Sequence, residues 1–126
     1  MGNSFQMVVI EDDPDLRKLI QVTLQFTAGW DVATAADGPA GIAAVRTRRP
    51  DAVVVDLMLP GMDGYAVCRA LKADAATAAI PLVLVTARKD IDEAEARRAG
   101  AAGVIFKPFS LDDFSGRIEA LCAPRP

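Results

Sequence analysis

The sequence contains no histidine, and this absence excludes several kinds of site. Neither a Ser-His-Asp triad nor a Cys-His pair can be built, and no metal ion can be held by imidazole. Any bound metal is therefore expected to be a hard cation held by oxygen atoms. If a phosphohistidine takes part in the chemistry of this chain, it must belong to a partner protein.

Cysteine is scarce, and no apolar run approaches the ~20 residues that span a bilayer. The amino-terminal segment lacks the basic stretch and the long apolar run of a signal peptide. We therefore expect a cytoplasmic protein with no membrane segment, in which Cys68 and Cys122 are reduced thiols that fill the core. The net charge is −3 and no basic stripe is evident, so we expect no direct binding to nucleic acid.

What the sequence does contain is a fivefold alternation of apolar, strand-like runs and helical patterns. Strands that alternate with helices imply βαβ units, a parallel sheet and right-handed crossovers. The third and fourth runs are almost wholly apolar, as expected for strands that helices cover on both faces. We predict an α/β fold, a doubly wound (βα)5 domain with strand order 2-1-3-4-5 and a topological switch between the first and third strands. The predicted strands are residues 7–10, 30–34, 52–55, 82–85 and 104–106.

The helical patterns carry more local predictions. The first helix should begin at Pro14 and bury Leu16, Leu19, Ile20 and Leu24. The fourth, about 91–99, has few large apolar anchors and should be the least firmly packed. Ser110 and Asp113 resemble a capping box before the last helix, whose expected buried stripe is Phe114, Ile118 and Leu121. Residues 1–126 are interpreted as a single domain, with about 123–126 as a terminal tail or the start of a linker.

Four of the apolar runs end in residues that suit phosphate and a hard metal ion. Glu11 and Asp12 follow the first run, Asp56 the third, Thr86 the fourth and Lys107 the fifth. Ligands of an open parallel sheet bind beyond the carboxyl ends of its strands, so these side chains are expected to converge on one pocket. Such a set suits a Mg²⁺-dependent site at which a carboxylate accepts a phosphoryl group.

Each of these residues also has an ordinary role: acid runs are usually solvated turns, strand-end aspartates cap helices, and lone lysines are solvated. Their combination is what indicates a site, because crowded carboxylates raise one another's pKa unless a cation neutralises them. Mg²⁺ uses a few carboxylates and keeps several waters, so Asp12 and Asp56 are the expected direct ligands, with Glu11 acting through water. As nucleophile, Asp56 would form an acyl phosphate, which Thr86 and Lys107 would contact.

From end to end the sequence resembles a response regulator receiver domain of bacterial two-component signalling, that is, a CheY-like domain. The matching segments are, in chain order, VIEDDP at 9–14, VVDLMLPGMDG at 54–64, VTA at 85–87 and KPF at 107–109. The resemblance implies a flavodoxin-like fold, in which a five-stranded parallel sheet of order 2-1-3-4-5 has helices on both faces.

The resemblance also implies that Asp56 takes its phosphoryl group from a histidine kinase or a phosphotransfer protein. The backbone carbonyl of Met58 would then complete the metal ligands, and the Lys107–Pro108 peptide bond would be cis. A second copy of the chain or a downstream effector would bind the face made by the fourth helix, the fifth strand and the last helix. The domain would assist its own phosphorylation and hydrolysis without being a turnover enzyme, because the acceptor is consumed in each cycle.

One position departs from the family pattern. Many receivers carry Tyr or Phe three residues before the lysine, whereas this chain has Val104 there and Phe106 two residues later. We hypothesise that phosphorylation draws Thr86 toward the phosphate and reshapes the fourth helix and its flanking loops. Met58 and Arg88 flank the site and are expected to tune the lifetime of the phosphate.

Other classes fit the sequence less well. A haloacid-dehalogenase-like phosphatase needs an acid two residues after its aspartate nucleophile, and Met58 stands at that position. A flavodoxin-like binding module needs a hydroxyl- and glycine-rich phosphate loop after the first strand, where this chain has three acids. A degenerate receiver, which would serve only as an interaction module, would have lost the acid pair, Asp56 or Lys107.

Overall fold

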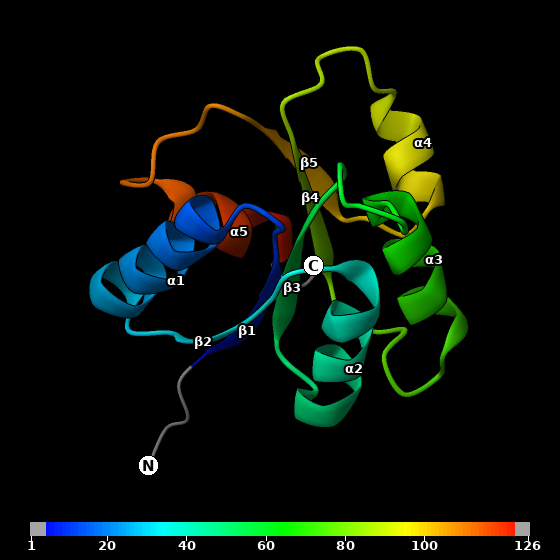
Figure 1. The fold of residues 1–126 in the computed structure, drawn as a ribbon, viewed down its shortest axis with the longest axis horizontal. Coiled ribbons are helices and arrows are strands. Elements are labelled where there is room, and N and C mark those ends of the chain that lie inside the picture. Colours follow the sequence, from blue (N-terminus) through cyan, green and yellow to red (C-terminus); the bar gives the residue numbers. More distant parts are fainter. Residues whose placement is uncertain (1–4, 123–126) are drawn as a thin grey trace.

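The computed structural model describes residues 5–122, so the tail assigned to residues 123–126 lies outside the described part of the chain. Within that part, strands and helices alternate strictly, as the sequence predicts (Figure 1). The elements are β1 (Gln6–Ile10), α1 (Pro14–Ala28), β2 (Asp31–Ala35), α2 (Gly38–Arg48), β3 (Ala52–Asp56), α3 (Gly64–Ala73), β4 (Leu82–Thr86), α4 (Glu93–Arg98), β5 (Gly103–Phe106) and α5 (Phe114–Cys122). None of the helices in residues 5–122 is long and apolar enough to cross a bilayer.

The strands form one parallel sheet in the order β2-β1-β3-β4-β5. Helices α1 and α5 cover one face, and α2, α3 and α4 cover the other (Figure 1). The predicted doubly wound fold and its strand order are therefore confirmed. The switch lies between β1 and β3, where Ile10 is paired with Val55, so the residues that follow these two strands lie side by side.

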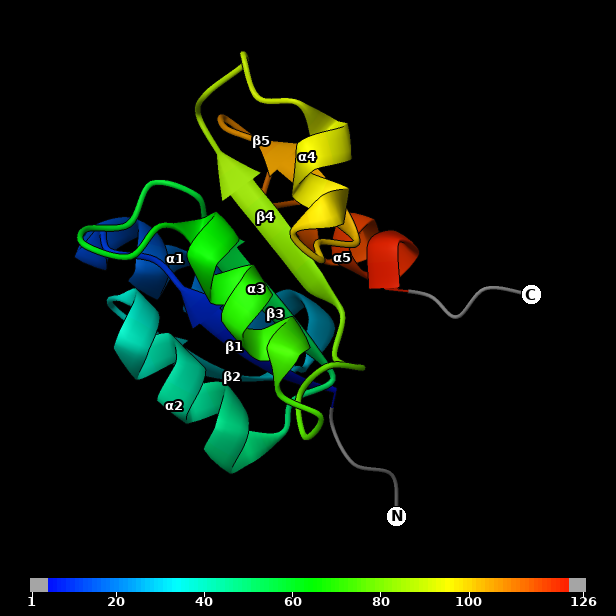
Figure 2. The ribbon, with the colours of Figure 1, turned by 90° about the vertical axis from the view of Figure 1, so that its right-hand side faces the viewer.

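The core has two halves because side chains alternate between the faces of each strand. On β3, Val53 and Val55 pack toward α2 and α3, whereas Val54 packs toward α1 and α5. Figure 2 shows the first of these faces, with α2, α3 and α4 lying in front of the sheet. Since helices cover both faces, every residue of β3 and β4 is buried. This burial explains why the sequence of these two strands is continuously apolar.

Side-chain caps fix where two of the helices begin after the strands. Asp13 accepts hydrogen bonds from the backbone N–H of Asp15 at 3.0 Å and of Leu16 at 3.4 Å, and Pro14 occupies the first turn of α1. Asp37 likewise accepts from the backbone N–H of Ala40 at 2.8 Å and starts α2. The chain therefore leaves β1 and β2 and turns directly into a helix, which keeps the strand ends open to ligands.

Two local predictions were wrong. Leu19, expected in the core, is 50% exposed, because it lies at the edge of α1 where Phe109 and Leu111 of the loop before α5 cover it only partly. The predicted capping box is absent, since the Ser110 hydroxyl accepts from the N–H of Asp112 at 3.2 Å and α5 begins only at Phe114. Ser110 thus makes a local turn, four residues ahead of the helix.

The predicted weak packing of the fourth helix agrees with its dimensions. It spans only Glu93–Arg98, and Ala96 is its one buried residue among those that the structure describes. Asp92 caps it by accepting from the N–H of Ala94 at 2.9 Å. On α5, Phe114 and Ile118 are fully buried and Leu121 is half-buried, as the apolar stripe predicts.

Candidate functional site

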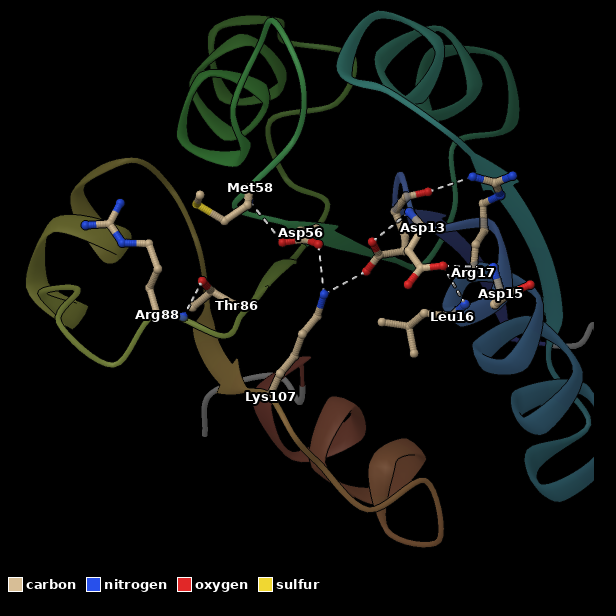
Figure 3. A network of polar contacts seen from close by, with 10 residues as sticks. Asp13, Asp15, Leu16, Arg17, Asp56, Met58, Thr86, Arg88 and Lys107 are labelled. Carbon is tan, nitrogen blue, oxygen red and sulfur yellow. Dashed lines mark hydrogen bonds and ion pairs between the residues drawn. The ribbon is translucent and has the colours of Figure 1, made fainter.

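At the carboxyl ends of the strands, the predicted residues Asp56, Thr86 and Lys107 lie close together (Figure 3). The amine of Lys107, which follows β5, donates to Oδ2 of Asp56 at 2.9 Å and to Oε1 of Glu11 at 3.1 Å. The three residues follow or end different strands: in the sequence, Asp56 is 51 positions and Glu11 is 96 positions from the lysine. The fold therefore joins one ammonium group and two carboxylates at the open edge of the sheet.

Three acids at this edge form a cluster. Glu11, Asp12 and Asp56 each offer a carboxylate oxygen, and these atoms all lie within 4.8 Å of one another. Glu11 and Asp56 are only 3% and 4% exposed, whereas Asp12 is exposed and faces solvent. These hard oxygen donors are buried on the side of the protein core and reach solvent at Asp12. Such a set fits a cation such as Mg²⁺, which retains several waters.

Burial has a direct electrostatic effect on Glu11. Desolvation, together with the neighbouring charge of Asp56, raises the pKa of this carboxyl from its ordinary 4.5 to about 7. Hydrogen bonds from the backbone N–H of Asp13 and from Lys107 act in the opposite direction. Without a metal ion, Glu11 therefore resists ionisation at neutral pH.

Lys107 is held as a cation by its two acids. Burial alone would lower the pKa of its amine, but hydrogen bonds to Asp56 and Glu11 outweigh this effect and raise it. The peptide bond to Pro108 is cis, as the resemblance implies. From the sequence, Glu11 was expected to act near a metal ion, and its direct contact with this lysine was not predicted.

Asp56 is fixed through both of its oxygens. Oδ2 bonds to Lys107, and Oδ1 accepts from the backbone N–H of Met58 at 3.0 Å. The side chain of Met58 itself is 54% exposed, so it stands at the mouth of the site. Behind Asp56, a Cβ added to Gly64 would lie only 2.7 Å from the Asp56 carbonyl oxygen, so α3 starts in direct contact with the end of β3.

Thr86 ends β4 next to Asp56 and is fully buried. Its hydroxyl oxygen accepts from the backbone N–H of Arg88 at 3.1 Å. A hydroxyl is also a donor, so Thr86 keeps its own O–H for another acceptor, such as a phosphoryl oxygen. Threonine thereby connects the site to the loop that follows β4.

A hollow of about 510 Å³ opens beside the acids. Its lining includes the two flanking residues that the sequence indicated, Met58 and Arg88, together with Asp12 and Asp63. Tyr65, at the start of α3, also lines it, and the sequence pointed to this residue only as part of a helix. The hollow therefore lies over the loop that follows Asp56 and is large enough to admit a small phosphate compound beside Asp12 and Met58.

Arg17 holds the backbone of Glu11 in place, a role that was not predicted from the sequence. Its guanidinium donates to the backbone carbonyl of Glu11 at 2.9 Å. Side chains of a helix lean toward its amino terminus, so a long residue in the first turn of α1 can reach back to the end of β1. The position of Arg17 was the available signal. A cation near the amino terminus of a helix interacts unfavourably with the helix dipole, so an arginine there is expected to have an acceptor nearby.

Comparison with known proteins agrees with this geometry. A family model described as the response regulator receiver domain matches residues 7–119. The DNA-binding response regulator MtrA of Mycolicibacterium smegmatis is 39% identical over 116 residues, which are 91% of this chain and 49% of that protein. The DNA-binding dual master transcriptional regulator RpaA of Synechocystis is 38% identical over 117 residues, 92% of this chain and 48% of that protein. The chain thus spans about half the length of these curated relatives.

Solved structures are similar over nearly the whole chain. The chemotaxis response regulator CheY4 of Vibrio cholerae has a TM-score of 0.87 at 25% identity, and the match covers 94% of this chain and 99% of that one. The signal receiver domain of a signal transduction histidine kinase from Syntrophus aciditrophicus has a TM-score of 0.84 at 26% identity. That match covers 95% of this chain and 91% of the other.

Proposed function

Because this chain belongs to the response regulator receiver domain family of two-component systems, we propose that Asp56 accepts a phosphoryl group from a phosphohistidine in a Mg²⁺-dependent reaction. The observation that supports this proposal best is the bridge from the Lys107 amine to Asp56 and Glu11, at 2.9 and 3.1 Å. It puts a nucleophile and a phosphate-binding cation at one point, beside an acid cluster that suits a divalent ion.

In the proposed transfer, a carboxylate oxygen of Asp56 attacks the phosphorus atom of the phosphohistidine. The new P–O bond forms as the P–N bond to the donor's imidazole breaks, and the product on this chain is an acyl phosphate. The amine of Lys107 moves from the carboxylates to an oxygen of the transferred group, and Thr86 donates its hydroxyl proton to another. The N–H of Met58, now bonded to Oδ1, keeps the Asp56 side chain oriented during the approach.

Glu11, Asp12 and Asp56 would hold the Mg²⁺, and the carbonyl of Met58 would complete the protein ligands. The donor set fits because it consists of hard oxygens from carboxylates, one of them exposed to solvent. When bound there, the ion offsets the negative charge of the acids and of the incoming phosphoryl group. Its positive charge would also favour the ionised form of Glu11, against the burial that raises the pKa of this acid.

The proposal includes the wider role of the domain. The donor is a histidine kinase or a phosphotransfer protein, and the α4-β5-α5 face is the surface for a second copy or a downstream effector. We place this chemistry in the cytoplasm, without direct contact to nucleic acid or membrane. The domain is a consumed acceptor rather than a turnover enzyme, and the exposed Met58, which stands where a phosphatase of this geometry needs an acid, supports that distinction.

The direct test is labelling with radioactive acetyl phosphate in the presence of Mg²⁺. The wild type should take up label that hydroxylamine removes, as expected for an acyl phosphate, and EDTA should prevent uptake. Asp56→Ala should remain unlabelled. Asp31→Asn, which changes an exposed acid at the opposite end of the strands, is the matched control and should be labelled like the wild type. Equal and stable labelling of Asp56→Ala would contradict the proposal.

A further inference from the structure

Lys89 ties the loop after β4 to the end of β5, and nothing in the proposed phosphoryl transfer uses it. Its amine donates to the backbone carbonyl of Lys107 at 2.9 Å and lies 5.2 Å from the centroid of the Phe106 ring. A cation within ~6 Å of an aromatic centroid is attracted to the ring face. Lys89 is exposed and Phe106 is half-buried, so this contact, which we call the Lys89 clasp, lies at the surface.

The clasp is connected to the site through short steps. The backbone N–H of Lys107 donates to the carbonyl of Thr86 at 2.8 Å, and the N–H of Arg88 donates to the Thr86 hydroxyl at 3.1 Å. Thr86 is therefore bonded on one side to the strand that carries Phe106 and on the other to the residue before Lys89. A shift of its side chain cannot leave the loop in place without breaking the bond to Arg88.

The loop itself is stiffened between Arg88 and Asp90. The guanidinium of Arg88 makes a two-pronged contact with the Asp90 carboxylate, at 3.1 and 3.0 Å. This pair is exposed, so it adds little to the stability of the fold, but it spans Lys89. Residues 88–90 are thus expected to move together when Arg88 is drawn toward the site.

We propose that Lys89 couples the phosphorylation site to β5: phosphoryl acceptance at Asp56 opens the Lys89 clasp and uncovers the ring of Phe106. The inference rests on the proposed function of Asp56. As the Thr86 hydroxyl turns to the phosphoryl group, Arg88 follows it and withdraws Lys89 from Phe106 and from the Lys107 carbonyl. Val104 lies on the same face of β5 but has no aromatic ring. In this chain the aromatic residue that changes its contacts is therefore Phe106.

Thermodynamic linkage gives the proposal a measurable sign. If the phosphorylated form has an open clasp, the closed clasp must weaken binding of a phosphoryl mimic, and its removal must strengthen binding by the same factor. For an exposed cation–π contact this factor is about two- to fivefold. Removing an unrelated positive charge should have no such effect.

The test uses beryllofluoride with Mg²⁺ as the probe and amide chemical shifts as the readout. Three variants are compared with the wild type: Lys89→Met, which removes the charge and keeps the length; Lys89→Arg, which keeps the charge; and Lys18→Met, which removes an exposed charge on α1. In Lys89→Met without the probe, the amides of Phe106 and Lys107 should already be displaced toward their bound positions. Its affinity for the probe should be about two- to fivefold higher. Lys89→Arg and Lys18→Met should behave like the wild type.

Two failures can be told apart. If the wild type is labelled at Asp56 and Lys89→Met shows wild-type affinity and wild-type shifts at Phe106 and Lys107, the clasp is not part of the switch and this inference is overturned alone. If the wild type neither binds beryllofluoride nor takes label from acetyl phosphate, the proposed function fails and the inference falls with it.

Discussion

The amine of Lys107 lies 2.9 Å from Oδ2 of Asp56, although 51 positions separate the two residues in the sequence. The same amine reaches Glu11, so one cation compensates two nearly buried carboxylates. The arrangement explains how the fold tolerates this much negative charge at one edge of its sheet. It also means that the lysine contributes to stability as well as to the proposed chemistry.

Replacing Lys107 by methionine should therefore destabilise the domain. Two acids would lose their counter-ion while staying buried, and we expect a loss of about 1–3 kcal/mol in the free energy of unfolding near pH 8. The loss should be smaller near pH 5, because Glu11 can then take up a proton. Urea unfolding of Lys107→Met and of the exposed-charge control Lys18→Met measures the difference. Equal stability of both variants at pH 8 would show that the bridge contributes nothing.

The raised pKa of Glu11 predicts that the free energy of unfolding depends on pH when no divalent ion is present. Burial raises the pKa of this acid to about 7 from an ordinary value of 4.5. The folded protein thus binds the proton more tightly than the unfolded chain, so the stability associated with protonated Glu11 is complete below pH 4.5 and is lost as the pH rises through 7.

The variant Glu11→Gln isolates this effect because its amide cannot ionise. Between about pH 5 and pH 8 the wild type should lose about 1–3 kcal/mol relative to the variant. Adding Mg²⁺ should reduce the loss in the wild type, since the ion favours the ionised carboxylates. Denaturant unfolding at several pH values, with EDTA and with Mg²⁺, measures both effects. Parallel stability curves for wild type and variant in EDTA would contradict the prediction.

The sequence was sufficient to predict where the acids and Lys107 meet because two general rules apply to it. Continuous apolar runs such as β3 and β4 occur where helices cover both faces, and parallel strands of one sheet end at the same edge. Once the alternation of strands and helices is recognised, Asp56 and Lys107 must lie at that edge. This prediction did not depend on the conformation of the loops that connect the strands and helices.

Loop contacts are what the sequence could not supply. The approach of Lys89 to Phe106 depends on the conformation of residues 87–92, which no periodic pattern specifies. Leu19 has the spacing of a buried residue, yet its exposure is decided by how far the loop with Phe109 reaches over α1. The contact between Glu11 and Lys107 similarly needed the lysine's direction, which is a property of one side chain rather than of the fold.

Gly64 should be essential for the position of Asp56. A Cβ at this residue would lie 2.7 Å from the carbonyl oxygen of Asp56, the last residue of β3, and 2.8 Å from the Cα of Leu57, which follows it; both are backbone atoms of buried residues and cannot yield. Gly64→Ala should push α3 from β3, cost about 1–3 kcal/mol and slow labelling of Asp56 by acetyl phosphate. Gly116→Ala is the control, because its Cβ would meet nothing within 4 Å and should stabilise α5 by about 0.5–1 kcal/mol. Wild-type labelling by Gly64→Ala would show that the contact does not position the acid.

Variants of Thr86 should separate the acceptance of the phosphoryl group from the conformational response to it. The attacking oxygen belongs to Asp56, so Thr86→Ala should still take label from acetyl phosphate. It should lose the response of the following loop, because the hydroxyl that links the phosphoryl group to Arg88 is gone.

Thr86→Ser keeps that hydroxyl and removes only a buried methyl group, at a cost of about 0.5–1.5 kcal/mol in stability. With beryllofluoride and Mg²⁺, the amides of Arg88 and Lys89 should shift in the wild type and in Thr86→Ser but remain near their free positions in Thr86→Ala. Full-size shifts in the alanine variant would mean that the loop responds to Asp56 by another route. Loss of the shifts in the serine variant as well would assign the coupling to the methyl group and its packing, since serine preserves every hydrogen bond that threonine makes at this position.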